Sequence, residues 1–132
     1  MGGKLKRSDL IYPDLSYQII GILFEVYNEL GPGHHEKYYQ KAVAVGFKKC
    51  NLSSQEQVCI PLTFKEEKVG KYFLDFLVEN KIVLEIKKGD RFSKRHIEQI
   101  LSYLKAKDLK LGIIANFGSQ ALKFKRIVNF DS

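Results

Sequence analysis

Three charged side chains on two neighbouring apolar segments have the types and spacing of a metal-dependent hydrolytic site. Glu85 and Lys87 lie at the end of the apolar run 82–86, and Asp75 interrupts a second apolar run, residues 72–78. Two neighbouring carboxylates repel each other, and a hard divalent cation relieves that repulsion while also holding water and phosphate. These residues therefore indicate chemistry assisted by Mg²⁺ or Mn²⁺, in which Lys87 contacts phosphate or helps to activate the attacking water.

Whether the two acids meet depends on the register of the hairpin between the two segments. A three-residue loop, 79–81, sets Asp75 directly opposite Glu85, with both side chains on one face of the sheet. A two-residue loop, 80–81, would point the two carboxylates to opposite faces. We predict the three-residue loop. The alternative interpretation is a surface ion pair between Asp75 and Lys87, because E-x-K occurs often by chance when 28% of the residues are charged.

Hydrophobic periodicity predicts the elements that carry these residues. A repeat of three and four residues favours a helix, whereas alternation or a continuous apolar run favours a strand. The predicted elements are a helix from a cap at Asp14 or Ser16 to about Leu30, a helix over 34–50, strands over 57–64, 71–78 and 82–87, a helix capped by Ser93 and ending near Lys107, a strand over 111–117 and a last strand over 122–130. Residues 66–70 are predicted to form a turn. The order α-α-β-β-β-α-β(-β) indicates an α/β fold with a mixed sheet flanked by helices.

Length and composition predict a single domain over residues 1–132. A chain of 132 residues, 45% of them hydrophobic, can bury one core, and its two cysteines are too few for a disulfide scaffold. Residues 1–12 are predicted to form a loosely packed arm. The apolar stretch 19–24 is far too short to span a membrane, and residues 1–7 lack the apolar core of a secretory signal. We therefore expect a cytoplasmic protein without membrane contact.

Positive charge is concentrated in the second half of the chain. The net charge is +7, and residues 67–132 carry +6 of it. A dense basic cluster is expected for a protein that binds a polyanion such as nucleic acid, although a solvated surface is the alternative interpretation. The candidate nucleic-acid-binding residues directly follow Lys87 and are Lys88, Arg91, Lys94, Arg95 and His96.

Taken together, these residues resemble the PD-(D/E)XK nuclease superfamily. Asp75 followed by residues 85–87 resembles its core motif, although Leu74 stands where the name of the motif has proline. Gln99 and Tyr103 resemble the Q-x-x-x-Y motif of the exonuclease-like branch. Their spacing of four residues places both on one helix face.

Two further segments resemble one small family within this superfamily. Residues 33–39 match G-x-x-E-x-x-Y, the pattern that names the GxxExxY proteins. Residues 111–118 resemble that family's L-G-L-L-I-N-F-G strand. The likeness extends from about residue 15 to residue 128, with the motifs in the same order.

The resemblance implies a restriction-endonuclease-like fold and an activity, the metal-assisted hydrolysis of phosphodiesters, with DNA as the favoured substrate. It is compatible with a homodimer, because many small nucleases dimerise to address two strands. The alternative is a nuclease fold that binds nucleic acid or a protein partner without turnover. The implied site residues are Asp75, Glu85, the backbone carbonyl of Ile86 and Glu36 as metal ligands, Lys87 as the catalytic lysine, and Gln99 and Tyr103 as groups that position the substrate or the lysine.

Overall fold

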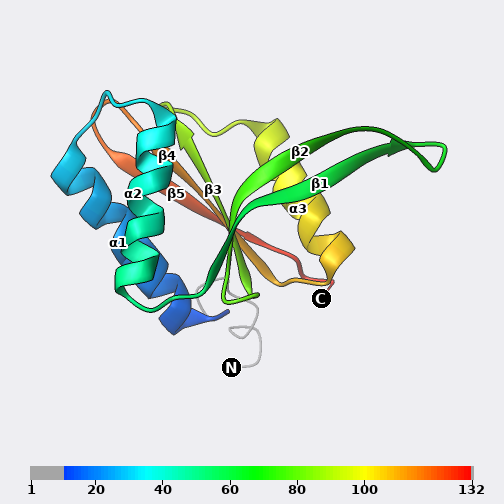
Figure 1. Cartoon of the computed structure of the whole chain (residues 1–132), viewed down its shortest axis with the longest axis horizontal. Helices are drawn as coiled ribbons and strands as arrows, with labels where there is room; N and C mark the ends of the chain where they lie inside the picture. Colours follow the sequence, from blue (N-terminus) through cyan, green and yellow to red (C-terminus); the bar gives the residue numbers. More distant parts are fainter. Residues whose placement is uncertain (1–10, 132) are drawn as a thin grey trace.

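A computed structural model gives the fold of the chain and describes residues 11–131. A five-stranded sheet lies between α1 and α2 on one side and α3 on the other (Figure 1). This architecture confirms the predicted α/β fold and the predicted order, including the last strand. The elements are α1 Pro13–Leu30, α2 Glu36–Lys49, β1 Ser54–Phe64, β2 Glu67–Val78, β3 Ile82–Lys88, α3 Lys94–Lys107, β4 Leu111–Phe117 and β5 Leu122–Val128. Of the N-terminal segment 1–12 that was predicted to pack loosely, residues 1–10 lie outside the described part of the chain.

The sheet is mixed, with its strands in the sequence order β1-β2-β3-β4-β5. β3 and β4 are parallel, and α3 makes the crossover between them, whereas the other neighbouring strands are antiparallel. Every residue of β4 is buried, as its continuous apolar run predicts. Because β3 and β4 are parallel, their carboxyl ends meet at the same edge of the sheet, next to the start of α3.

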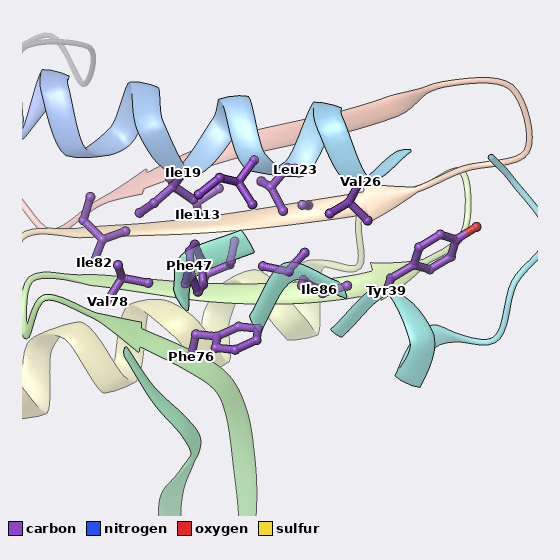
Figure 2. Close-up of a cluster of buried hydrophobic side chains, with 14 of the residues drawn as sticks. Ile19, Leu23, Val26, Tyr39, Phe47, Phe76, Val78, Ile82, Ile86 and Ile113 are labelled. Atoms are coloured by element: carbon purple, nitrogen blue, oxygen red, sulfur yellow. The ribbon is translucent and has the colours of Figure 1, made fainter. Parts of the chain in front are cut away.

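Side chains alternate between the two faces of the sheet and create two packed layers. On one face, Ile82 and Ile86 of β3 pack with Ile19 of α1 and Phe47 of α2 (Figure 2). On the other face, Val83 packs beneath α3 with residues such as Ile100 and Leu104. By the alternation along β3, Glu85 and Lys87 share the α3 face with Val83.

The β1–β2 hairpin forms an arm that continues past the rest of the sheet (Figure 1). Its turn is the pair Lys65 and Glu66, both with positive φ, and strand pairing continues on either side with a bulge between Leu62 and Thr63. The prediction of a turn over 66–70 was therefore wrong. Charged residues and a glycine resemble a turn in the sequence, yet they are also tolerated in an exposed hairpin. Pro61, which has no backbone N–H to donate, lies in β1 at the edge of the sheet, where proline is tolerated.

The start of α1 also differs from the prediction. The helix begins at Pro13 with Tyr12 at the N-cap, and no capping hydrogen bond comes from Asp14 or Ser16. Proline suits the first helical turn because its missing N–H would have no partner there. The Ser16 hydroxyl instead accepts a hydrogen bond of 3.2 Å from Nε of Arg126, which ties α1 to β5.

The other helix boundaries lie close to their predictions. α2 occupies Glu36–Lys49 within the predicted range 34–50. Ser93 caps α3 as predicted, since its hydroxyl accepts a hydrogen bond of 3.4 Å from the backbone N–H of His96. β5 ends at Val128, two residues before the predicted end. Within residues 11–131, no helix is both long and apolar enough to cross a bilayer.

Candidate active site

The two predicted acids meet where β2 separates from β3. The hairpin pairs Val78 with Ile82 and continues in that register to Phe76 and Leu84, which confirms the three-residue loop. The next pair in this register is Asp75 and Glu85, where side chains replace the backbone ladder.

Each carboxylate at this fork accepts a hydrogen bond from the opposite strand. The Asp75 backbone N–H donates to Oε1 of Glu85 at 3.0 Å, and the Ile86 N–H donates to Oδ2 of Asp75 at 2.7 Å. Across from Asp75 on β1, Gln57 has a positive φ of 53°, so the ladder is interrupted on both sides of this residue. The acids thus hold the strands together at the point where the arm leaves the sheet.

Burial of the two carboxyl groups changes their protonation. Asp75 is 7% exposed and Glu85 is 4% exposed. Burial, reinforced by the neighbouring Asp75, raises the pKa of Glu85 to about 8. Burial also raises the pKa of Asp75, although hydrogen bonds to its carboxylate oppose that shift. In the absence of a cation, the pair therefore retains a proton near neutral pH.

Lys87 lies beside the pair and contacts Glu85. Its Nζ is 3.6 Å from Oε2 of Glu85, and its side chain is 29% exposed. The alternative interpretation, a surface ion pair between Asp75 and Lys87, does not describe this geometry, because Asp75 is buried and the ion pair is made by Glu85.

The start of α2 brings a third acid towards this fork. Oε1 of Glu36 accepts a hydrogen bond of 3.0 Å from the Lys88 backbone N–H. The amide of Gln40, one helical turn later, donates to Oδ1 of Asp75 at 3.0 Å and lies 3.5 Å from Oε2 of Glu36. Gln40 was not predicted, although its spacing of four residues from Glu36 places the two on one helix face.

The residues that meet here suit a hard divalent cation that takes only some of its ligands from the protein. No cluster of three or more histidine, cysteine or acidic side chains able to hold a metal occurs in residues 11–131. Asp75 and Glu85 provide two carboxylates, and Gln40 connects Glu36 to this pair by hydrogen-bonding both Glu36 and Asp75. Mg²⁺ and Mn²⁺ are commonly held by one or two carboxylates, with water and substrate phosphate completing the shell. The donor set fits such a cation.

Comparison with known proteins gives the family of the chain. A family model described as the PD-(D/E)XK nuclease superfamily matches residues 13–127. The chain belongs to that superfamily. No match is found among curated proteins. Among solved structures, "Crystal structure of SSO0001" is similar with a TM-score of 0.44 and 13% identity, over 87% of this chain and 77% of that chain.

Membership of the PD-(D/E)XK superfamily agrees with the observed mixed sheet and its flanking helices. Asp75, Glu85 and Lys87, which were predicted to form the superfamily's acid–acid–lysine pattern, are the residues that meet at the fork. Their roles as metal ligands and catalytic lysine remain predictions, as does the contribution of the Ile86 carbonyl.

Gln99 and Tyr103 lie farther along α3 and do not join the acids. Gln99 lines a groove of about 320 Å³ between α3 and the arm, together with Tyr72 and Arg95. Tyr103 is buried in the core beneath α3, and burial raises the pKa of its hydroxyl. In the described part of the chain, no hydrogen bond links either residue to the carboxylates, so their positioning roles remain predictions.

The five predicted basic residues surround the same edge of the sheet. They occupy the end of β3, the following loop and the first turn of α3, and four of them are exposed. His96 is partly buried, and this burial, with the positive charge of Lys87, lowers its pKa. His96 is therefore close enough to Lys87 to interact with its charge. The five residues are Lys88, Arg91, Lys94, Arg95 and His96.

Proposed function

We propose that this protein is a nuclease that hydrolyses phosphodiester bonds in nucleic acid, most readily DNA, with Mg²⁺ or Mn²⁺ as cofactor. The observation that carries the proposal is the buried Asp75–Glu85 pair with Lys87 beside it, at a sheet edge bordered by basic residues. Membership of the PD-(D/E)XK nuclease superfamily supports the same conclusion.

In this proposal, each group has a separate task. Asp75 and Glu85, with the Ile86 carbonyl and Glu36, hold the cation, which when bound activates water and stabilises charge on the phosphoryl oxygens. Lys87 orients the attacking water. The basic residues at the start of α3 hold the backbone of the substrate through its phosphates. Gln99 and Tyr103, farther along the same helix, position the substrate or Lys87.

We also propose that the protein is a GxxExxY protein within the superfamily. Each defining position of the motif, Gly33, Glu36 and Tyr39, has a distinct structural role that supports this assignment. Gly33 has a positive φ of 93°, and Glu36 starts α2 beside the acid pair. Tyr39 stacks on Phe117 and donates a hydrogen bond of 2.7 Å to the Gly31 carbonyl. The motif thus joins the loop before α2 to the end of β4.

A second candidate function is binding without turnover. Two observations favour it: only two carboxylates meet directly, and the arm exposes apolar side chains suited to a protein partner. The most exposed of these are Phe64 and Val69, at 63% and 60%. This candidate predicts nucleic-acid binding that depends on salt and is indifferent to divalent cations.

A cleavage assay separates the two candidates. Purified protein is incubated with labelled single-stranded DNA, double-stranded DNA and RNA, in Mg²⁺, in Mn²⁺ and in EDTA. We expect cleavage that requires the cation and is lost in Asp75→Ala and Glu85→Ala. Glu29→Ala, which removes an exposed acid from α1, is the matched control and should cleave normally. Absence of cleavage, or cleavage unchanged by both substitutions at the fork, rules out the nuclease.

A further inference from the structure

Asn116 on β4 is a buried polar side chain without a partner. It is 1% exposed, and neither its Nδ2 nor its Oδ1 has a hydrogen-bond partner among the described residues. A buried amide in this condition costs free energy, and such groups are rare in native proteins.

The other buried asparagine of residues 11–131 is fully engaged. Nδ2 of Asn129 donates to the Leu109 carbonyl at 3.0 Å, and its Oδ1 accepts from the Asp131 backbone N–H at 3.2 Å. Packing in this fold therefore does satisfy a buried amide where the amide serves structure. The unpaired amide of Asn116 calls for a different explanation.

The strand register places Asn116 between two lysines. Parallel pairing sets it beside Lys87 of β3, and antiparallel pairing sets it beside Lys123 of β5. Residues in register on neighbouring strands point to the same face, and the strands are about 4.8 Å apart. The row Lys87, Asn116 and Lys123 thus crosses the α3 face of the sheet, and either ammonium group can reach the amide.

The two lysines differ in their exposure and in the acidic residue that lies near each of them. Lys123 is exposed, and Asp90 lies close enough for their charges to interact. Lys87 is partly buried and contacts Glu85, which is itself a proposed metal ligand. A cation bound at Glu85 offsets the negative charge that attracts Lys87. Of the two lysines, Lys87 is therefore the one that needs a second acceptor.

We propose that Asn116 is a positioning residue for Lys87, whose ammonium group donates to Oδ1 of Asn116 when a divalent cation occupies the Asp75–Glu85 pair. This inference rests on the proposed function. A neutral amide oxygen fixes the direction of the lysine without adding another negative charge beside the metal ligands. The arrangement keeps Lys87 at the site of the attacking water after Glu85 has turned to the metal.

Nuclear magnetic resonance tests the contact without any measurement of activity. The side-chain amide signals of Asn116 in ¹⁵N-labelled protein are assigned by their loss in Asn116→Leu, and Mg²⁺ is then titrated. We expect these signals to shift with Mg²⁺ in the unmodified protein and in Lys123→Met, but not in Lys87→Met. An equal shift in Lys87→Met, or no shift while calorimetry shows Mg²⁺ binding, overturns the proposal.

The same titration separates failure of this inference from failure of the proposed function. Absence of Mg²⁺ binding by calorimetry overturns both the metal site and the positioning role. Binding of Mg²⁺ with the expected shift, but without cleavage of any nucleic acid, supports the contact and rejects the nuclease.

Kinetics and stability give a second test with matched variants. We expect Asn116→Leu to be as stable towards urea as the unmodified protein, while kcat falls about 10–100-fold and KM stays within about twofold. Asn116→Ala, which adds no bulk, should lose kcat in the same way. Asn129→Leu, the matched control, should be less stable yet keep its kcat. An unchanged kcat in both Asn116 variants, or a change in KM alone, contradicts the positioning role.

Discussion

At the scale of single residues, the acid pair serves structure and proposed chemistry at once. Asp75 and Glu85 each accept a backbone N–H that the strand ladder no longer satisfies. Both are buried, and burial raises the pKa of each. A proton and a divalent cation are therefore alternative ways to balance the same buried charge.

This competition predicts how the stability of the metal-free protein depends on pH. The pKa of Glu85 is raised from 4.5 to about 8, so the folded protein binds this proton more tightly than the unfolded chain. Stability then falls as the pH rises from about 4.5 through about 8. Urea unfolding in EDTA should show this fall, and Glu85→Gln should be more stable than the unmodified protein at pH 8. Equal stability of the two proteins across that range contradicts the coupling.

At the scale of elements, the packing of α2 decides where Glu36 and Gln40 lie. α2 packs against α1 at Gly46, where an added Cβ would lie 2.5 Å from Cγ2 of Ile22. The absence of a side chain at this position allows the two helices to approach. The N-terminal turn of α2 can then reach the fork between β2 and β3.

A pair of glycine substitutions tests this helix contact. Gly46→Ala should destabilise the protein by about 1–3 kcal/mol, because the new methyl group overlaps a buried isoleucine. Gly21→Ala is the control: nothing lies within 4 Å of its added Cβ, and alanine favours the helix, so it should stabilise by about 0.5–1 kcal/mol. Denaturant unfolding measures both. If Gly46→Ala does not destabilise the protein, α1 and α2 do not pack closely at Gly46.

The sequence predicts best what depends on local pattern. The loop 79–81 sets the register of β2 and β3, so the meeting of Asp75 and Glu85 follows from the position of a turn. The turn over 66–70 was predicted wrongly, since a polar stretch with a glycine is compatible with both a turn and an exposed hairpin.

Contacts that depend on packing between elements could not be predicted in the same way. Gln40 reaches Asp75 because α2 packs against β3, and the burial of the Asn116 amide without a partner depends on which side chains pack around the end of β4. Gln40 had a weak signal in its spacing from Glu36. Asn116 matches the asparagine of the L-G-L-L-I-N-F-G strand that residues 111–118 resemble, but that resemblance does not say whether the amide has a hydrogen-bond partner.

At the scale of the whole molecule, the positive charge lies around an acidic centre. The second half of the chain carries most of the net charge, and the exposed basic residues border the edge where Asp75 and Glu85 meet. The acids help to hold β2 and β3 together, but a protein that only bound nucleic acid would be expected to keep negative charge away from the surface that contacts phosphate. This distribution favours cleavage over binding alone.

The charge distribution predicts a localised dependence of DNA binding on salt. Lys94→Ala combined with Arg95→Ala should weaken binding and reduce the slope of log K against log salt concentration by about 1.8, because two phosphate contacts are lost. Lys48→Ala with Lys49→Ala removes the same charge from the last turn of α2, whose first turn lies at the fork. This double substitution should leave that slope nearly unchanged. Binding is measured by fluorescence anisotropy in EDTA. Equal effects of the two double variants would indicate that no particular surface binds DNA.

The most direct test of the central claim is the position of Mn²⁺ in a crystal soaked with that ion. The anomalous signal of manganese locates the ion independently of any activity. The proposed nuclease predicts a peak between the carboxylates of Asp75 and Glu85, which is absent from Glu85→Gln crystals treated in the same way. No peak at the fork, in crystals that take up Mn²⁺ elsewhere, would contradict the account.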